Sequence, residues 1–169
     1  MKKNNSLIIL AIVVVLVVGV VLSSKSNKTS ITPPVSQSNT TVGSKEQTRT
    51  FQSTSTMKFA ITVPVIYEIV EKFGSASINT GKGTISIGQN GTNFNNLKEY
   101  IKNSRNNLEA RIVNRKELRI NGLEAVSGNI GSEKTYFIYV ENRVYSLSTS
   151  SPVLFPDLDQ IAQSFRYTP

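Results

Sequence analysis

The N-terminal part of the chain contains sixteen consecutive residues, Leu7 to Leu22, with no charged or polar side chain. As a helix this run spans about 24 Å, and the flanking Ser6, Ser23 and Ser24 can extend it toward the roughly 30 Å hydrocarbon core of a bilayer. No polar stripe interrupts the run, which argues against a helix lying flat on a membrane surface. We therefore expect residues 7–24 to form one transmembrane helix that acts as a signal anchor.

The charges around this segment indicate its orientation. Lys2 and Lys3 precede the apolar run, which favours a cytoplasmic N-terminus over residues 1–6 and a C-terminal part outside the cytoplasm. A second interpretation is a cleaved signal peptide, with the cleavage site near Ser23, and the protein is then secreted. Both interpretations export the rest of the chain, and we favour the anchor. The chain has no cysteine, which excludes lipid attachment through an N-terminal cysteine.

Residues 25–50 have the composition of a disordered linker. Ser, Thr, Asn, Gln and Lys dominate this segment, which also contains Pro33 and Pro34. Such a segment cannot bury enough apolar surface to offset the entropy lost on ordering. A flexible linker of this length has a root-mean-square reach of about 30 Å, enough to hold a domain clear of the lipid headgroups. Residues 51–169 are then long enough for one domain with its own core.

The net charge does not indicate a nucleic-acid partner. The chain carries a formal charge of +8, but six basic residues and one glutamate lie in residues 1–50. That part therefore carries +5, and residues 51–169 carry the remaining +3. A domain charge of +3 is ordinary for a soluble domain and argues against nucleic acid as a partner.

The hydrophobic pattern of residues 51–169 predicts an α+β domain with an antiparallel sheet and helices packed against it. The spacing of Phe94, Leu97, Ile101 and Leu108 predicts one helix over 94–108, and a short closing helix is expected from Asp157. Alternating apolar residues and turn residues predict strands at 57–63, 67–73, 75–79, 84–87, 109–120, 123–130, 134–140 and 144–149.

Two of these strands carry more specific information. Asn121-Gly122 predicts a two-residue hairpin in which Leu118 faces Ala125 and Arg119 faces Glu124 as an ion pair. Strand 134–140 is apolar on both faces, which is typical of a strand covered on both sides. We therefore expect helices on both faces of the sheet.

The residue types argue against an enzyme and against a metal or cofactor site. The chain has no histidine and no cysteine, which removes the commonest general base, the usual zinc ligands and thiol nucleophiles. Asp157 and Asp159 fall in the first turn of the last helix, where the helix dipole explains them. The remaining alternative is a hydrolase with two facing carboxylates, and its candidates are Glu68, Glu71, Glu99, Glu109, Glu117, Glu124, Glu133 and Glu141.

Three arginines form the one candidate binding feature. Arg111, Arg115 and Arg119 share parity on one predicted strand, and Lys98, Lys102 and Arg105 precede them closely in sequence. Such a face can bind the anionic groups of phospholipids or acidic wall polymers. The competing interpretation is a solvated strand face, because Glu109 and Glu117 have the same parity and dilute the field.

The order of elements resembles the PsbP-like (PsbP/Mog/DcrB-type) domains. The resemblance covers about residues 51–169 and depends on the segments MKFAITVP, NGLEAVSG, KTYFIYVENRVYSLS and DLDQIAQSFRY, the last with Ser164-Phe165 near the end of its helix. It implies an antiparallel sheet sandwiched by helices. It also implies non-enzymatic roles, since members include an extrinsic photosystem subunit, a Ran-binding nuclear transport factor and periplasmic lipoproteins. No functional residue carries over to this chain, which lacks the lipoprotein cysteine and photosynthetic targeting features.

Taken together, these patterns predict a single-pass, bacterial-type cell-membrane protein with one extracytoplasmic domain. We expect this domain to bind or scaffold a protein or envelope component without catalysis and without a cofactor. The alternatives are anion binding through the arginines and, less favoured, a glutamate-based hydrolase.

Overall fold

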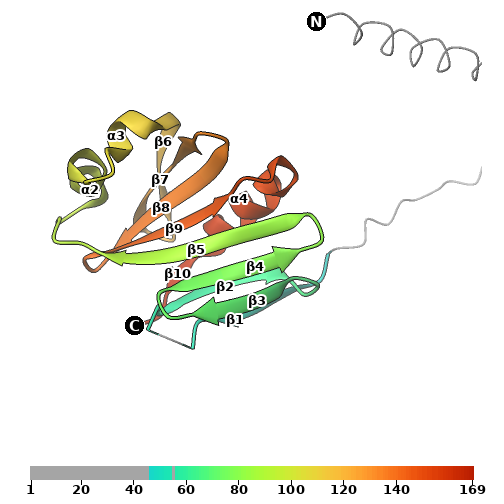
Figure 1. Cartoon of the computed structure of the whole chain (residues 1–169). Coiled ribbons are helices and arrows are strands. Elements are labelled where there is room, and N and C mark those ends of the chain that lie inside the picture. The colour runs from blue at the N-terminus through green and yellow to red at the C-terminus, as the bar shows by residue number, and fades with distance from the viewer. Residues whose placement is uncertain (1–45, 55) are drawn as a thin grey trace, which may run out of the picture. The chain divides into compact units, whose positions relative to one another are not determined.

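A computed structural model describes residues 46–54 and 56–169 of the chain (Figure 1). The predicted cytoplasmic N-terminus, the predicted anchor at residues 7–24 and residues 25–45 of the predicted linker lie outside the described residues. Among the residues described, no helix has both the length and the hydropathy needed to cross a membrane.

The described residues form two antiparallel sheets and a few helices, which confirms the predicted α+β class. The smaller sheet has the order β1-β2-β10, with β1 at Thr48–Gln52, β2 at Phe59–Pro64 and β10 at Arg166–Tyr167. The larger has the order β3-β4-β5-β9-β8-β7-β6. Its strands are β3 (Glu68–Lys72), β4 (Ser75–Thr80), β5 (Gly83–Gly91), β6 (Ile112–Ile120), β7 (Leu123–Ile130), β8 (Glu133–Val140) and β9 (Arg143–Thr149). The helices are α2 (Leu97–Asn103), α3 (Leu108–Arg111), the short 3-10 helix η2 (Pro152–Leu154) and α4 (Phe155–Ser164).

The larger hydrophobic core lies where the seven-stranded sheet, the small sheet and α4 meet. Helix α4 packs against β2, β9 and β6 (Figure 1). Three rings fill the centre: the Phe165 ring lies 5.8 Å from that of Phe59 and 4.9 Å from that of Tyr145, between centroids. All three side chains are fully buried, so this cluster holds the last helix against both sheets.

A second core covers the opposite face of the seven-stranded sheet. Here Leu97 and Ile101 of α2 and Leu108 of α3 pack on Val126 and Phe137 of the sheet. On β8, Phe137 belongs to this core, whereas the neighbouring Ile138 belongs to the larger one. The prediction of helices on both faces of the sheet is therefore confirmed, and the doubly apolar strand was the correct reason for it.

The hairpin at Asn121-Gly122 has the predicted register, with Leu118 opposite Ala125 and Arg119 opposite Glu124. Asn121 and Gly122 both have positive φ, at 49° and 85°, as a type I′ turn requires. The Asn121 side chain also donates hydrogen bonds to the backbone oxygens of Gln163 and Phe165, at 3.2 and 2.8 Å. The turn therefore closes the hairpin and also fastens it to the end of α4.

Several predicted boundaries differ from the structure, and three of these differences change the layout of the elements. Strand β1 begins at Thr48, inside the predicted linker, because residues 48–52 find a pairing partner in β2 that composition does not reveal. The predicted helix 94–108 is broken between Asn103 and Leu108, where Asn107 adopts φ of +50°. The predicted strand from residue 109 begins at Ile112, because the preceding four residues form α3.

Candidate functional site

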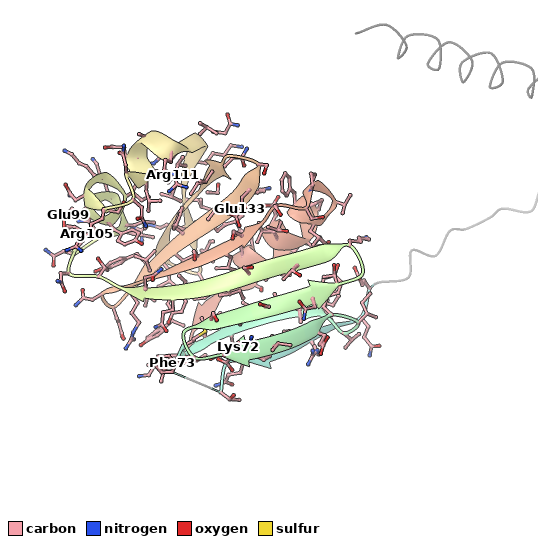
Figure 2. The ribbon with its side chains drawn as sticks, viewed as in Figure 1. Lys72, Phe73, Glu99, Arg105, Arg111 and Glu133 are labelled. Carbon is pink, nitrogen blue, oxygen red and sulfur yellow. The ribbon has the colours of Figure 1, made fainter. Side chains whose placement is uncertain are left out.

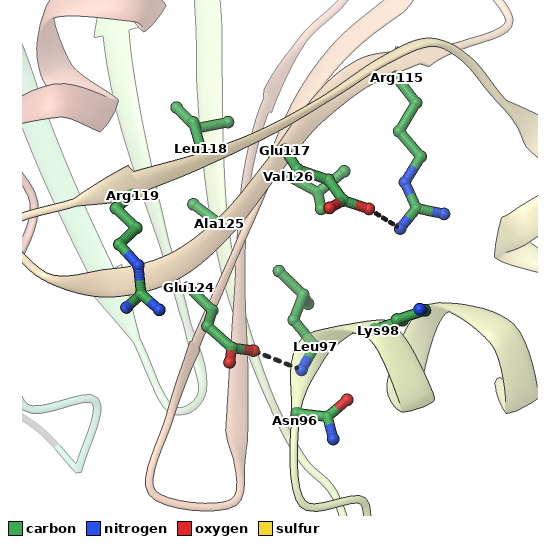
Figure 3. A pocket seen from close by; sticks show the side chains of 10 residues that line it. All are labelled: Asn96, Leu97, Lys98, Arg115, Glu117, Leu118, Arg119, Glu124, Ala125 and Val126. Carbon is green, nitrogen blue, oxygen red and sulfur yellow. Dashed lines mark hydrogen bonds and ion pairs between the residues drawn. The ribbon is translucent and has the colours of Figure 1, made fainter.

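A groove of about 540 Å³ lies between the start of α2 and the neighbouring strands β6 and β7 (Figure 3). The end of the preceding loop and the first turn of α2 form one wall, and the hairpin β6–β7 forms the other. Both apolar and charged side chains line the groove. The lining residues are Asn96, Leu97, Lys98, Arg115, Glu117, Leu118, Arg119, Glu124, Ala125 and Val126.

A β-bulge in β6 decides which side chains reach this groove. The pairing shifts by one residue between Val113 and Lys116, and Asn114 within the bulge has φ of +53°. The shift reverses the facing of the strand. Ile112 therefore faces the α2 side before the bulge, where a Cβ on Gly128 would collide with it, and Arg115 faces the same side after it.

The basic residues that share a face differ from those that the sequence predicted. Arg115 and Arg119 line the groove together, as their shared parity predicted. Arg111 does not belong to that face, because it is the last residue of α3 and lies before the strand begins. Glu109, which was expected to dilute the same face, also lies in α3. Lys98 takes the third basic position, and its sequence proximity to the arginines was the available indication.

Arg115 makes an ion pair, but one of its guanidinium N–H groups has no hydrogen-bond partner in the described part of the chain. Its Nη2 donates to Glu117 Oε1 at 2.8 Å, and the side chain is 26 % exposed. Its Nε is buried and has no hydrogen-bond partner among the described residues. Since this N–H is enclosed by protein atoms, it is a local cost to the fold and not a donor that a molecule in the groove can reach.

Glu124 fixes the position of α2 against the sheet. Its Oε2 accepts a hydrogen bond from the backbone N–H of Leu97 at 3.1 Å, at the first residue of the helix (Figure 3). The helix start is capped locally as well, because Asn96 accepts from Glu99 N–H at 2.8 Å and Glu99 accepts from Asn95 N–H at 3.2 Å. The N–H groups of Leu97, Glu99 and Tyr100 thus have partners within the domain.

The predicted ion pair between Arg119 and Glu124 is wrong, although the register that suggested it is right. Arg119 Nη1 donates to the backbone oxygen of Gly122 at 2.9 Å, within the hairpin turn. No ion pair between the two side chains occurs in the described part of the chain, because Glu124 is directed to the helix start. The groove therefore holds three cationic side chains and two carboxylates, of which one balances Arg115 and the other serves α2.

The two aspartates of the last helix have a role that the helix dipole did not reveal. Tyr67 Oη donates to Asp157 at 2.6 Å, and Tyr136 Oη donates to Asp159 at 2.6 Å. Lys134 also pairs with Asp159. Burial first, and then these hydrogen bonds to carboxylates, raise the pKa of both tyrosines well above the usual value of about 10. The aspartates therefore fasten α4 to β8 and to the turn that joins β2 to β3.

No other site with obvious chemistry is found in the described residues. A smaller hollow of about 270 Å³ lies beside Asp157, between α4 and the first two strands. Residues 46–54 and 56–169 contain no cluster of three His, Cys, Asp or Glu side chains able to hold a metal ion.

Comparisons with known proteins do not assign this domain to a family. Neither the known protein-family models nor the curated proteins give a match.

Proposed function

We propose that the chain is a membrane-anchored, extracytoplasmic binding protein whose groove between α2 and the β6–β7 hairpin receives its partner. In this proposal residues 7–24 hold the protein in the cell membrane, and the folded domain has the PsbP-like architecture. An antiparallel sheet covered by helices on both faces supports that architecture. The observation that carries the proposal is the groove itself, in which an apolar floor and convergent polar groups occur together, as is typical of binding sites.

The charges in the groove favour a ligand with an anionic group. Lys98, Arg115 and Arg119 outnumber Glu117 and Glu124, so the charged side chains of the groove sum to +1. Glu117 pairs with Arg115 and Glu124 accepts from Leu97 N–H, which leaves Lys98 and Arg119 without an acidic partner among the described residues. Leu97 and Val126 offer apolar contact beside these groups. A phosphate or carboxylate on a small apolar or glycerol-like body fits this arrangement, as in a phospholipid headgroup or an acidic wall polymer.

The glutamate-based hydrolase remains the second hypothesis, because two carboxylates line the same groove. Acid-base hydrolysis needs both carboxyl groups directed at the scissile bond. Glu117 and Glu124 are instead directed at Arg115 and at Leu97 N–H. This arrangement supports binding over catalysis.

The test is a binding measurement on the full-length chain in neutral detergent. The probes are short-chain phosphatidylglycerol below its micelle concentration and a glycerol phosphate oligomer, with short-chain phosphatidylcholine as the neutral probe. The double variant Arg115→Gln and Arg119→Gln should weaken binding of an anionic probe about tenfold or more. The matched control is Arg105→Gln with Arg111→Gln, which removes the same charge outside the groove.

The control pair should retain nearly the full affinity. Equal weakening by both pairs would mean that only the overall charge matters, and the groove would lose its role. Glu117→Gln separates the two hypotheses, because removing this carboxylate strengthens anion binding but abolishes turnover in a hydrolase.

A further inference from the structure

Exposed apolar side chains concentrate at one edge of the seven-stranded sheet, around its outermost strand. Four of the six large hydrophobic side chains that are exposed in the described residues lie within nine positions of the sequence: Val65, Ile66, Val70 and Phe73. Phe73 is 89 % exposed and Ile66 79 %. Single exposed apolar residues are ordinary, but a concentration of them indicates a contact surface.

This concentration surrounds strand β3, the end strand of the seven-stranded sheet, with Phe73 in the turn that follows it (Figure 2). Strand β3 pairs with β4 on one side. Strand β1 belongs to the other sheet and forms no backbone ladder with β3. Near β3, Arg49 donates to Tyr67 O at 3.0 Å, and the backbone N–H of Thr54, just after β1, donates to the Glu71 carboxylate at 3.0 Å. Glu68, Val70 and Lys72 share one face of β3 and are exposed, whereas the side chains between them are half-buried.

We propose that β3 pairs antiparallel with β3 of a second copy of this chain, so that two seven-stranded sheets join edge to edge. The strand is self-complementary in the register centred on Val70. In that register Glu68 of each copy faces Lys72 of the other, and the two Val70 side chains meet on the two-fold axis. An exposed edge strand with this pattern is the surface that strand pairing between chains uses.

The other registers fit worse. Sliding the pair by two residues in one direction places Val70 opposite Lys72, and sliding it in the other direction places Val70 opposite Glu68. Either slide separates the charges that the centred register brings together. The centred register also brings Phe73 of one copy close to the start of β3 in the other, where Ile66 is exposed. Val70, Phe73 and Ile66 then belong to one contact.

The backbone pattern of the hairpin agrees with the centred register. Lys72 and Ser75 flank a two-residue turn and form a hydrogen-bonded pair, so Val70 and Ser77 do the same two positions further along. The backbone groups of Val70 therefore point toward β4. On the outer edge Val70 is a non-hydrogen-bonded position, where facing Cα atoms of an antiparallel pair approach to about 4.5 Å.

That distance suits a disulfide, and the chain has no native cysteine to interfere. The test uses the full-length variant Val70→Cys in neutral detergent and in phosphatidylcholine vesicles, under mild oxidation. We expect a covalent dimer whose yield changes little on dilution in vesicles. The matched control is Val153→Cys, which places a thiol at an exposed valine of η2. It should give dimer only through random collision.

Charge reversal decides whether the predicted register forms the contact. In the Val70→Cys background, Lys72→Glu alone or Glu68→Lys alone should lower the dimer yield about tenfold, because like charges then face each other twice. The combination of both reversals restores opposite charges and should restore the yield. Equal yields from Val70→Cys and Val153→Cys, or a double reversal that fails to recover, would overturn the proposal. Circular dichroism on each variant verifies the fold.

Discussion

Asn114 is the residue on which the composition of the groove depends. It adopts a left-handed conformation inside the bulge of β6, and the bulge places Arg115 on the same face of the sheet as Ile112. Asn tolerates this conformation, whereas a β-branched residue does not. Asn114→Val should therefore lower the free energy of unfolding by about 1–2 kcal/mol, and Asn114→Gly should leave it nearly unchanged. Urea denaturation measures both, and equal effects of the two variants would show that backbone strain is not the cause.

Tyr145 makes the stability of the fold depend on pH in the alkaline range. Its hydroxyl donates to Met57 O and accepts from Gln89 Nε2 at 3.3 Å, and burial raises its pKa to about 12. A phenol whose pKa is higher in the folded state stabilises the fold fully below about pH 10, and this contribution is lost as the pH rises toward 12.

The urea midpoint of the wild type should therefore fall between pH 10 and 12, and it should fall less steeply in Tyr145→Phe. The other tyrosines with raised pKa remain in both proteins, so the difference between the two slopes isolates Tyr145. Parallel slopes would contradict this assignment.

Sequence patterns predicted individual elements to different degrees. The β6–β7 hairpin was predicted with its register, because Asn-Gly specifies the turn geometry and the pleat then decides every facing pair. The helix over 94–108 was predicted as one element, because apolar spacing continues through the break. The break itself comes from a local conformation, in which Ser104 Oγ accepts from Leu108 N–H at 3.3 Å and Asn107 is left-handed. Neither the hydrogen bond nor the left-handed residue changes the spacing of apolar residues in the sequence.

The position of α2 depends on one contact across elements, from Leu97 N–H to Glu124 on β7. Glu124→Gln keeps an acceptor but removes the charge near the helix start, and should cost about 0.5–1 kcal/mol. Glu124→Ala also leaves the N–H without its acceptor, and should cost about 1–3 kcal/mol.

Hydrogen exchange of the α2 amides is the direct measurement, because the helix should open more often than the sheet does. Glu133→Gln is the control, since this carboxylate makes no ion pair among the described residues. If α2 exchanged at the wild-type rate in Glu124→Ala, the contact would not position the helix.

At the scale of the whole domain, the predicted class and the covering of both sheet faces followed from sequence, but the location of the groove did not. Of the three arginines that the sequence grouped together, Arg115 and Arg119 line the groove. Their grouping assumed an uninterrupted strand, and the bulge together with α3 removed Arg111 from it. Helix α2 forms the opposite wall of the groove. It could be placed only once the pairing of β6 with β7 was known. Sites formed between elements therefore depend on irregularities that hydrophobic periodicity does not record.

The two cores share the seven-stranded sheet, and this should make the folded domain a single cooperative unit. Strands β7, β8 and β9 contribute Ala125, Ile138 and Leu147 to the larger core. The same strands contribute Val126, Phe137 and Val144 to the smaller one. Loosening either core therefore removes support from strands that the other core needs.

Phe165→Ala should lower the free energy of unfolding by about 3–5 kcal/mol, and Ile101→Ala by about 2–5 kcal/mol, since both side chains are fully buried. Both variants should still unfold in one transition, with coincident urea curves from far-ultraviolet circular dichroism and from tyrosine fluorescence. Val153→Ala, at an exposed position, should shift neither curve. If Ile101→Ala instead gave an early separate transition, α2 and α3 would be an independently opening layer, and the groove beneath them would be formed only part of the time.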